Sequence, residues 1–261
     1  MHRFGVNLRI CRHVPCSRNG VTMCLLAFDF DGTIAKDGQV PANVVESLRR
    51  AAAQSYALFL VTGRLYRQAS IDAIVPWLTG IVWENGAVIE HLPSCHIALP
   101  FGTIPDAMIH ELTQLGIEVI RGKAIAATWA HHEPRLQPIT AKYEDRITFE
   151  YNKGALMILP RGANKASGLQ QLLAYAGLDG EPVIAFGDGE NDQTLLEMAH
   201  LGIAVQDAVP SLRTRAGRVT RLPGPDGVVE VLHDLLASRD REQNSCTTQN
   251  RDRWIEMLHE L

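Results

Sequence analysis

The sequence has few cysteines, and their number and spacing argue against a disulfide framework. There are five in the 261 residues, at positions 11, 16, 24, 95 and 246. A chain of this length can bury a core without disulfides, so we expect reduced thiols and a cytoplasmic protein. Cys11 and Cys16 flank His13, but no second pair of ligands is present to complete a tetrahedral metal site.

The sequence also lacks an excess of positive charge and a long apolar run. With 25 Lys and Arg against 29 Asp and Glu, it has no basic patch of the kind that nucleic-acid-binding proteins use, so we exclude a nucleic-acid partner. No apolar run approaches the roughly 20 residues that cross a bilayer, and the first residues lack the apolar segment of a signal peptide. This predicts neither a membrane partner nor export. Residues 1–22 are polar and aperiodic, and we expect a disordered extension there.

Apolar runs alternate with helical patterns over much of the chain. Strands are expected at residues 24–28, 57–61, 81–83, 183–186 and 202–205. Helices are expected from residue 41, after residues 62–64, from residue 165 to 173 and at residues 194–199. This order predicts an α/β fold with a Rossmann-like, doubly wound parallel sheet.

A different pattern interrupts this alternation and predicts a smaller inserted domain. It consists of helices at residues 105–115 and 134–143 and strands at residues 117–120, 124–129, 147–151 and 155–159. We therefore predict a catalytic core from residues 23–86 and 161–237, an inserted α+β cap at residues 87–160, and a polar tail at residues 238–261.

Four polar clusters stand at the ends of predicted strands or at the start of the following helix. They are residues 29–33 (Asp-Phe-Asp-Gly-Thr), 62–64 (Thr-Gly-Arg), 164–165 (Asn-Lys) and 187–192 (Gly-Asp-Gly-Glu-Asn-Asp). Because ligands bind beyond the carboxyl ends of parallel strands, we expect these clusters to meet in space.

The carboxylates of these clusters predict a metal site. Asp29 and Asp31 point to the same side of an extended chain, and Asp188 and Asp192 add further negative charge. Such a concentration of like charge requires a cation, and oxygen-only ligands suit Mg²⁺. We therefore predict magnesium as the cofactor.

The same clusters contain the groups that phosphoryl transfer requires. Asp29 can attack phosphorus as the nucleophile, and Asp31 can protonate the leaving oxygen and then activate water. The candidates for contacting or orienting the phosphoryl group are Gly32, Thr62, Gly63, Lys165 and Asn191.

In order and spacing, these clusters resemble the four motifs of haloacid dehalogenase-type phosphatases. The resemblance implies that Asp29 is the nucleophile, that Asp31 is the acid and base, and that the Asp31 carbonyl joins Asp29 and Asp188 around Mg²⁺. Because about 100 residues separate Thr62 from Lys165, the cap is the later insertion. This resembles the Cof-like, type IIB subgroup with a C2 cap, and the short cap is similar to that of the phosphoglycolate phosphatase type.

Several residues have a second interpretation. Asn191 and Asp192 could cap a helix, and Arg64 could bind substrate or begin a helix. Asn85, with Gly86, is either a hinge turn or a substrate contact. The polar cap candidates for substrate selection are Arg121, His131 and His132, although such residues are more often surface groups.

The function that these features favour is hydrolysis of a small phosphorylated metabolite, either a sugar phosphate or a phosphoglycolate-like acid. One alternative is a phosphomutase that returns the aspartyl-phosphate to a second hydroxyl. Another is a non-catalytic or regulatory module. A dehalogenase is disfavoured, because displacement at carbon needs neither Asp31 nor Mg²⁺.

Overall fold

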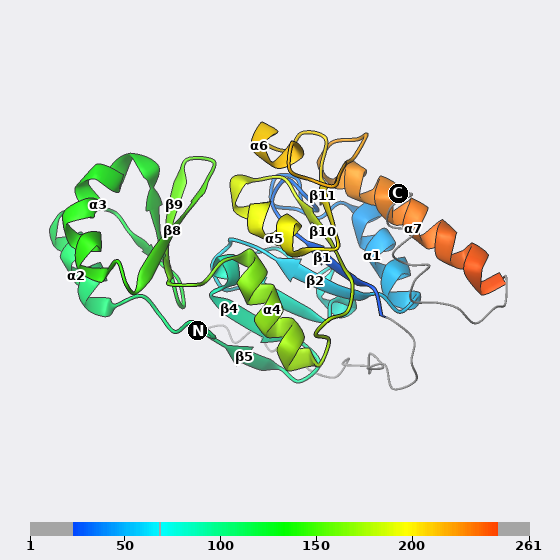
Figure 1. Ribbon diagram of the computed structural model, residues 1–261, viewed down its shortest axis with the longest axis horizontal. Helices are drawn as coiled ribbons and strands as arrows, with labels where there is room; N and C mark the ends of the chain where they lie inside the picture. Colours follow the sequence, from blue (N-terminus) through cyan, green and yellow to red (C-terminus); the bar gives the residue numbers. More distant parts are fainter. Residues whose placement is uncertain (1–22, 68, 245–261) are drawn as a thin grey trace, which may run out of the picture.

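The computed structural model describes residues 23–67 and 69–244, and its centre is an eight-stranded sheet (Figure 1). The strand order is β12-β11-β10-β1-β2-β3-β4-β5. Their bounds are β1 (Leu25–Phe28), β2 (Ala57–Val61), β3 (Gly80–Trp83), β4 (Val88–His91), β5 (His96–Ala98), β10 (Val183–Gly187), β11 (Leu201–Ala204) and β12 (Arg218–Val219). The strands from β12 to β3 are parallel, which confirms the predicted fold class.

Strand β1 lies in the middle because it is apolar on both faces. All four of its residues are buried, and they pair in parallel register with β10 on one side and β2 on the other. A strand that is covered on both faces needs such a continuous apolar run. The residues after Phe28 therefore emerge at the middle of the carboxyl edge of the sheet.

Helices cover both faces of the sheet. Their bounds are α1 (Ala42–Ala53), α4 (Lys165–Ala176), α5 (Gln193–Met198), α6 (Pro210–Arg213) and α7 (Gly224–Asn244). Helix α1 packs against α7, and α4 packs against α5 on the opposite side of the sheet (Figure 1). At the start of α4, the Asn164 side chain accepts a hydrogen bond from the Ser167 N–H, while the Ser167 hydroxyl accepts one from the Asn164 N–H. This capping box fixes where Lys165 enters the helix.

The prediction of a helix directly after residues 62–64 is wrong. From residue 65 to 74, apart from residue 68, the chain forms turns and bends, and a 3-10 turn, η1 (Val75–Trp77), follows. Arg67 has a φ of +59°, and the Tyr66 N–H donates to the Glu84 carboxylate instead of to a helical carbonyl. Helical hydrogen bonding is therefore interrupted at the first turn.

A second, antiparallel sheet of four strands lies beside the core in the order β6-β7-β9-β8 (Figure 1). Its strands are β6 (Ile120–Arg121), β7 (Ala126–Trp129), β8 (Ile147–Asn152) and β9 (Ala155–Pro160), and its helices are α2 (Asp106–Gln114) and α3 (Glu133–Thr140). These elements form a separate apolar cluster that includes Met108, Leu112 and Leu136. The second unit therefore has a core of its own, and we call it the cap.

The structure departs from the predicted boundaries in two places. Residues 88–98, assigned above to the cap, form β4 and β5, which extend the large sheet antiparallel to β3. The reason is the tight 3-10 turn η2 (Glu84–Gly86), which folds the chain back so that Val88 and Ile89 are buried in the main core. Helix α7 continues to Asn244, so the first residues of the predicted tail are helical. The extension at residues 1–22 and the tail after residue 244 lie outside the described residues.

Within the described part of the chain, no helix is long and apolar enough to cross a membrane. Cys24 and Cys95 are free thiols. The other three cysteines lie outside the described residues.

Candidate active site

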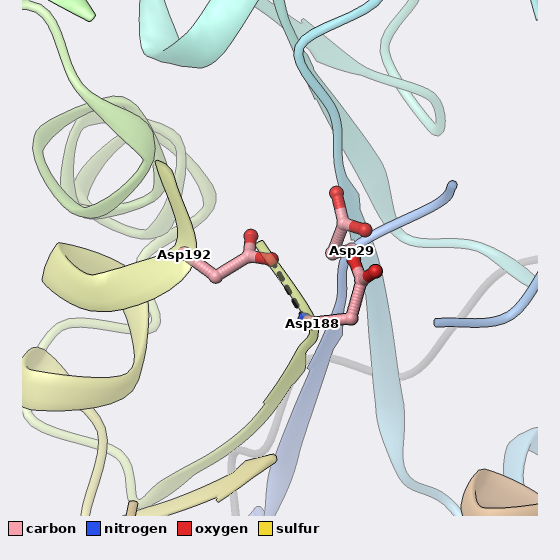
Figure 2. Close-up of side chains that lie close together, drawn as sticks. All are labelled: Asp29, Asp188 and Asp192. Carbon is pink, nitrogen blue, oxygen red and sulfur yellow. Dashed lines mark hydrogen bonds between the residues drawn. The ribbon is translucent and has the colours of Figure 1, made fainter. Parts of the chain in front are cut away.

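Three carboxylates meet at the carboxyl edge of the large sheet (Figure 2). Asp29 follows β1, Asp188 follows β10, and Asp192 lies one turn further on in the 3-10 turn η5 (Glu190–Asp192). All three are buried, and one oxygen from each lies within 4.8 Å of the others. The parallel register of β1 and β10 produces this meeting, because it brings the two strand ends side by side.

Lys165 lies between two of these carboxylates. Its Nζ donates to Asp29 Oδ1 and to Asp192 Oδ1, both at 2.5 Å, and its side chain is only 1% exposed. Burial lowers the pKa of Lys165, but the charges of Asp192 and Asp29 outweigh this and leave the pKa raised. Lys165 is therefore a fixed positive charge beneath the site.

Burial also controls the protonation of the carboxylates. It is the largest cause that raises the pKa of Asp29 to about 8, with the charge of Asp192 adding to it and Lys165 opposing it. Burial likewise raises the pKa of Asp188, against the opposing hydrogen bond from Lys153. The charged forms of Asp29 and Asp188 are therefore disfavoured in this buried setting, and a bound cation would stabilise them.

Asp192 also builds the loop that carries Asp188. Its Oδ2 accepts hydrogen bonds from the backbone N–H groups of Asp188 and Gly189, each at 2.9 Å. It stands at the N-cap position of α5, but its side chain makes no capping hydrogen bond there. In η5, however, Asp192 is the third residue, and its carboxylate accepts from the N–H of the N-cap residue Gly189, so the helix-cap interpretation holds for η5 and not for α5.

Gly32 allows the Asp188 carboxylate to approach the main chain. A Cβ at position 32 would lie 2.2 Å from Asp188 Oδ2, and the φ of Gly32 is +89°, which side chains disfavour. Thr33 Oγ1 donates to Asp188 Oδ1 at 3.5 Å. The motif at residues 29–33 therefore packs directly against the motif at residues 187–192.

Asp31 does not join the three carboxylates. Its side chain is 44% exposed and is held by Arg64, which donates from Nε to Oδ2 and from Nη2 to Oδ1, both at 2.7 Å. The Arg64 guanidinium also lies over the Phe30 ring, 5.1 Å from its centroid. Arg64 does not begin a helix, and instead it fixes the direction of the Asp31 side chain.

A buried amide pair connects two other motifs. Asn191 Nδ2 donates to Asn85 Oδ1 at 2.9 Å, and Asn85 Nδ2 contacts Met157 Sδ in β9 of the cap at 2.8 Å. Gly63 gives Asn85 room, because a Cβ there would lie 3.0 Å from Asn85 Oδ1. Thr62, at the end of β2, is buried, and its hydroxyl accepts from the Arg64 N–H. Asn85 therefore lies where the core meets the cap.

The cap candidates from the sequence are not part of this cluster. Arg121 pairs with Asp106 on the cap surface. His131 and His132 lie at the end of β7 with their rings 4.0 Å apart. Among the interactions of the described residues, none joins these three side chains to the core motifs.

The cap approaches the site through another segment, the β8–β9 hairpin. Lys153 Nζ donates to Asp188 Oδ2 at 2.7 Å. Asn152 Oδ1 is buried without a hydrogen-bond partner, 2.8 Å from where a Gly189 Cβ would stand. Burial raises the pKa of Glu150 to about 7, and the charges of Lys165 and Asp192 also act on it. The only sequence signal for this contact was the turn-forming Asn-Lys-Gly between two strand patterns.

Glu84 is another residue that the sequence did not single out. It is fully buried, and its carboxylate accepts from the backbone N–H groups of Tyr66 in the core and of Lys123, Ala124 and Ile125 in the cap. It therefore fastens the cap to the core close to the site.

The chain matches one family model and several curated proteins over most of its length. The model of haloacid dehalogenase-like hydrolases matches residues 26–99 and 107–232. Phosphoglycolate phosphatase 2 of Saccharolobus solfataricus is 28% identical over 226 residues, and the match covers 84% of this chain and 94% of the relative. A 5-amino-6-(5-phospho-D-ribitylamino)uracil phosphatase of Bacillus subtilis is 25% identical and covers 82% of this chain and 97% of its own.

Solved structures share the fold. A Thermoplasma acidophilum protein superposes with a TM-score of 0.70 at 15% identity and covers 82% of this chain and 99% of its own. A haloacid dehalogenase-like hydrolase from Bacteroides thetaiotaomicron gives a TM-score of 0.69 at 20% identity, with coverage of 82% and 99%. The family match spans most of the chain and establishes that it belongs to the haloacid dehalogenase-like hydrolases.

Proposed function

We propose that this protein is a magnesium-dependent phosphatase that hydrolyses a small phosphomonoester through a phosphoryl-aspartate on Asp29. The observation that carries the proposal is the buried Asp29, bound to Lys165 and set among further carboxylates at the carboxyl edge of the sheet. A carboxylate in this setting can act as a nucleophile toward a phosphoryl group, whose charge Lys165 and a cation would balance.

The donor set fits magnesium. Asp29, Asp188 and Asp192 offer only carboxylate oxygens, within 4.8 Å of one another, and hard cations such as Mg²⁺ prefer oxygen. Asp29 and Asp188 would hold the ion with the Asp31 carbonyl. Asp192 would complete the acidic set while it orients the Asp188 loop. When bound, the ion supplies positive charge that screens the attacking carboxylate from the phosphoryl oxygens.

The reaction has two steps on the residues of this chain. Asp29 attacks phosphorus, the bond between phosphorus and the ester oxygen breaks, and Asp31 gives its proton to the leaving oxygen. Asp31 then takes a proton from water, which attacks phosphorus and releases Asp29 and inorganic phosphate. For both transfers the Asp31 side chain must leave its ion pair with Arg64. Lys165 and Thr62 hold the phosphoryl oxygens.

The substrate is a small phosphorylated metabolite, either a sugar phosphate or a phosphoglycolate-like acid. Support comes from the relatives, several of which are named phosphoglycolate phosphatase, and from a solved neighbour described as a sugar phosphatase. The short cap is consistent with a compact leaving group.

The test is phosphate release from phosphoglycolate, a panel of sugar phosphates and an aryl phosphate, with Mg²⁺, by wild type and Asp29→Asn. We expect release by wild type only, while circular dichroism shows an unchanged fold in the variant. Phosphate release by a folded Asp29→Asn variant would refute the covalent step. Conversion to an isomer without free phosphate would replace the phosphatase by a mutase.

A further inference from the structure

The tip of the β8–β9 hairpin carries a residue in a conformation that its side chain disfavours. Asn152 and Ala155 pair across the hairpin, and between them Lys153 has a φ of +49° and Gly154 a φ of +86°. Two-residue turns with positive φ at both positions favour Asn or Gly at the first, where Lys is strained. Local folding alone would therefore favour another residue at position 153.

The Lys153 side chain points to a reason for this strain. Its Nζ crosses from the cap to the core and donates to Asp188 Oδ2, although the side chain remains 51% exposed. Besides Asp188, the charges that act on Lys153 are those of Asp29 and Asp192. The hairpin therefore places a positive charge at the cap side of the carboxylate cluster, and strain that is retained at such a place indicates a functional use.

The direction of approach defines which part of a substrate Lys153 would meet. Asp29 attacks from the core, so the leaving group lies opposite it, toward the cap. Lys165 already supplies positive charge on the core side. Next to Lys153, the unpartnered Asn152 Oδ1 also faces the Gly189 loop, which shows that the hairpin tip, and not the histidines of η3 (Ala130–His132), borders the site.

We propose that Lys153 is a substrate-binding residue that recognises a carboxylate on the leaving group, so that the substrate class is the phosphomonoester of a short hydroxy acid. This inference rests on the proposed phosphatase function and narrows its substrate. Lys153 would lose Asp188 as a partner if that carboxylate held a cation, and a substrate carboxylate would then restore a charge-assisted hydrogen bond.

The test compares phosphoglycolate with its amide, which has the same shape without the carboxylate charge. The variant is Lys153→Asn, which removes the ammonium but places a residue favoured at positive φ in the turn. The matched control is Lys142→Asn, which removes the same charge from the Glu111 pair elsewhere on the cap. Steady-state kcat and KM are measured for both compounds and for an aryl phosphate.

We expect Lys153→Asn to raise KM for phosphoglycolate roughly 10- to 100-fold while KM for the amide and the aryl phosphate changes little, as the loss of one charged hydrogen bond predicts. In saturating Mg²⁺, its melting temperature should equal or exceed that of wild type, and Lys142→Asn should preserve the preference for the acid. Equal effects on acid and amide, no effect on either, or a melting temperature lowered in saturating Mg²⁺ would overturn the assignment.

Binding to Asp29→Asn separates this inference from the proposed function. Calorimetric titration of that variant with the acid and the amide, with and without Lys153→Asn, measures recognition without turnover. A preference for the acid that disappears with Lys153→Asn supports the inference even if wild type releases no phosphate. Release of phosphate without any such preference overturns the role of Lys153 and leaves the phosphatase intact.

Discussion

Replacing Glu84 by Gln should destabilise the protein far more than a change of one atom suggests. Glu84 Oε1 accepts from the N–H groups of Tyr66 at 3.0 Å and Lys123 at 2.7 Å, and Oε2 accepts from those of Ala124 at 2.8 Å and Ile125 at 3.2 Å. In glutamine, an NH2 group replaces one of these two oxygens. This NH2 donor would then face two backbone N–H donors.

The magnitude follows from the two hydrogen bonds that the amide cannot make. Each bond to a charged group contributes about 1.5–3 kcal/mol, and Glu84 is fully buried, so water does not replace the loss. We therefore expect Glu84→Gln to lower the free energy of unfolding by about 3 kcal/mol or more. Glu46→Gln is the matched control, because Glu46 pairs with Arg49 at the surface, where solvent screens the pair and its loss should change stability little.

The assay is urea unfolding of both variants and wild type, with hydrogen exchange of the amides of residues 123–125. These amides should exchange faster in Glu84→Gln, because three of the four donors belong to the cap segment. If Glu84→Gln lowered the free energy of unfolding by less than about 1 kcal/mol, or left hydrogen exchange at residues 123–125 unchanged, the Glu84 carboxylate would not fasten the cap to the core.

Three further predictions concern the site. Asp31→Asn should lower kcat for phosphate release by roughly 100-fold or more with an unchanged circular dichroism spectrum, and a change below tenfold would remove Asp31 as the acid and base. Chelation should stop release reversibly, and Mg²⁺ should raise the melting temperature of wild type but much less that of Asp188→Asn; an equal rise in both would place the ion elsewhere. Because burial raises the pKa of Glu150 to about 7, the folded protein binds a proton there that the unfolded chain has released, so stability should fall as pH rises from about 4.5 to about 7. Urea unfolding across this range should show a shallower fall in Glu150→Gln, and equal slopes would contradict the buried carboxyl.

The sequence predicted the core part of the site because the polar motif residues come directly after the predicted strands. Asp29 and Asp188 each come directly after an apolar run, so parallel register alone brings them together. It was less informative where tertiary hydrogen bonds decide local structure. The helix expected after Arg64 is absent because the Tyr66 N–H donates to Glu84, a partner that no local pattern reveals.

The contact between cap and core could not be predicted, because it depends on how two separately folded units meet. Position 153 lies in an ordinary hairpin by sequence, and only the placement of β8 and β9 against the η5 loop brings its side chain to Asp188. Arg121, His131 and His132 had the right chemistry for a substrate site, but they lie on parts of the cap that do not meet the motifs.

The charges at this contact explain why the cap and the metal site should act together. Three buried carboxylates face two lysines, and only Lys165 belongs to the core, whereas Lys153 comes from the cap. Without a cation, Lys153 is the group that partly balances Asp188, so it holds the hairpin against the site. A divalent cation would take over that role and free the ammonium for an incoming anion. Metal binding would therefore prepare the cap side of the site for its substrate, through the same residue that sets the preference for a carboxylate.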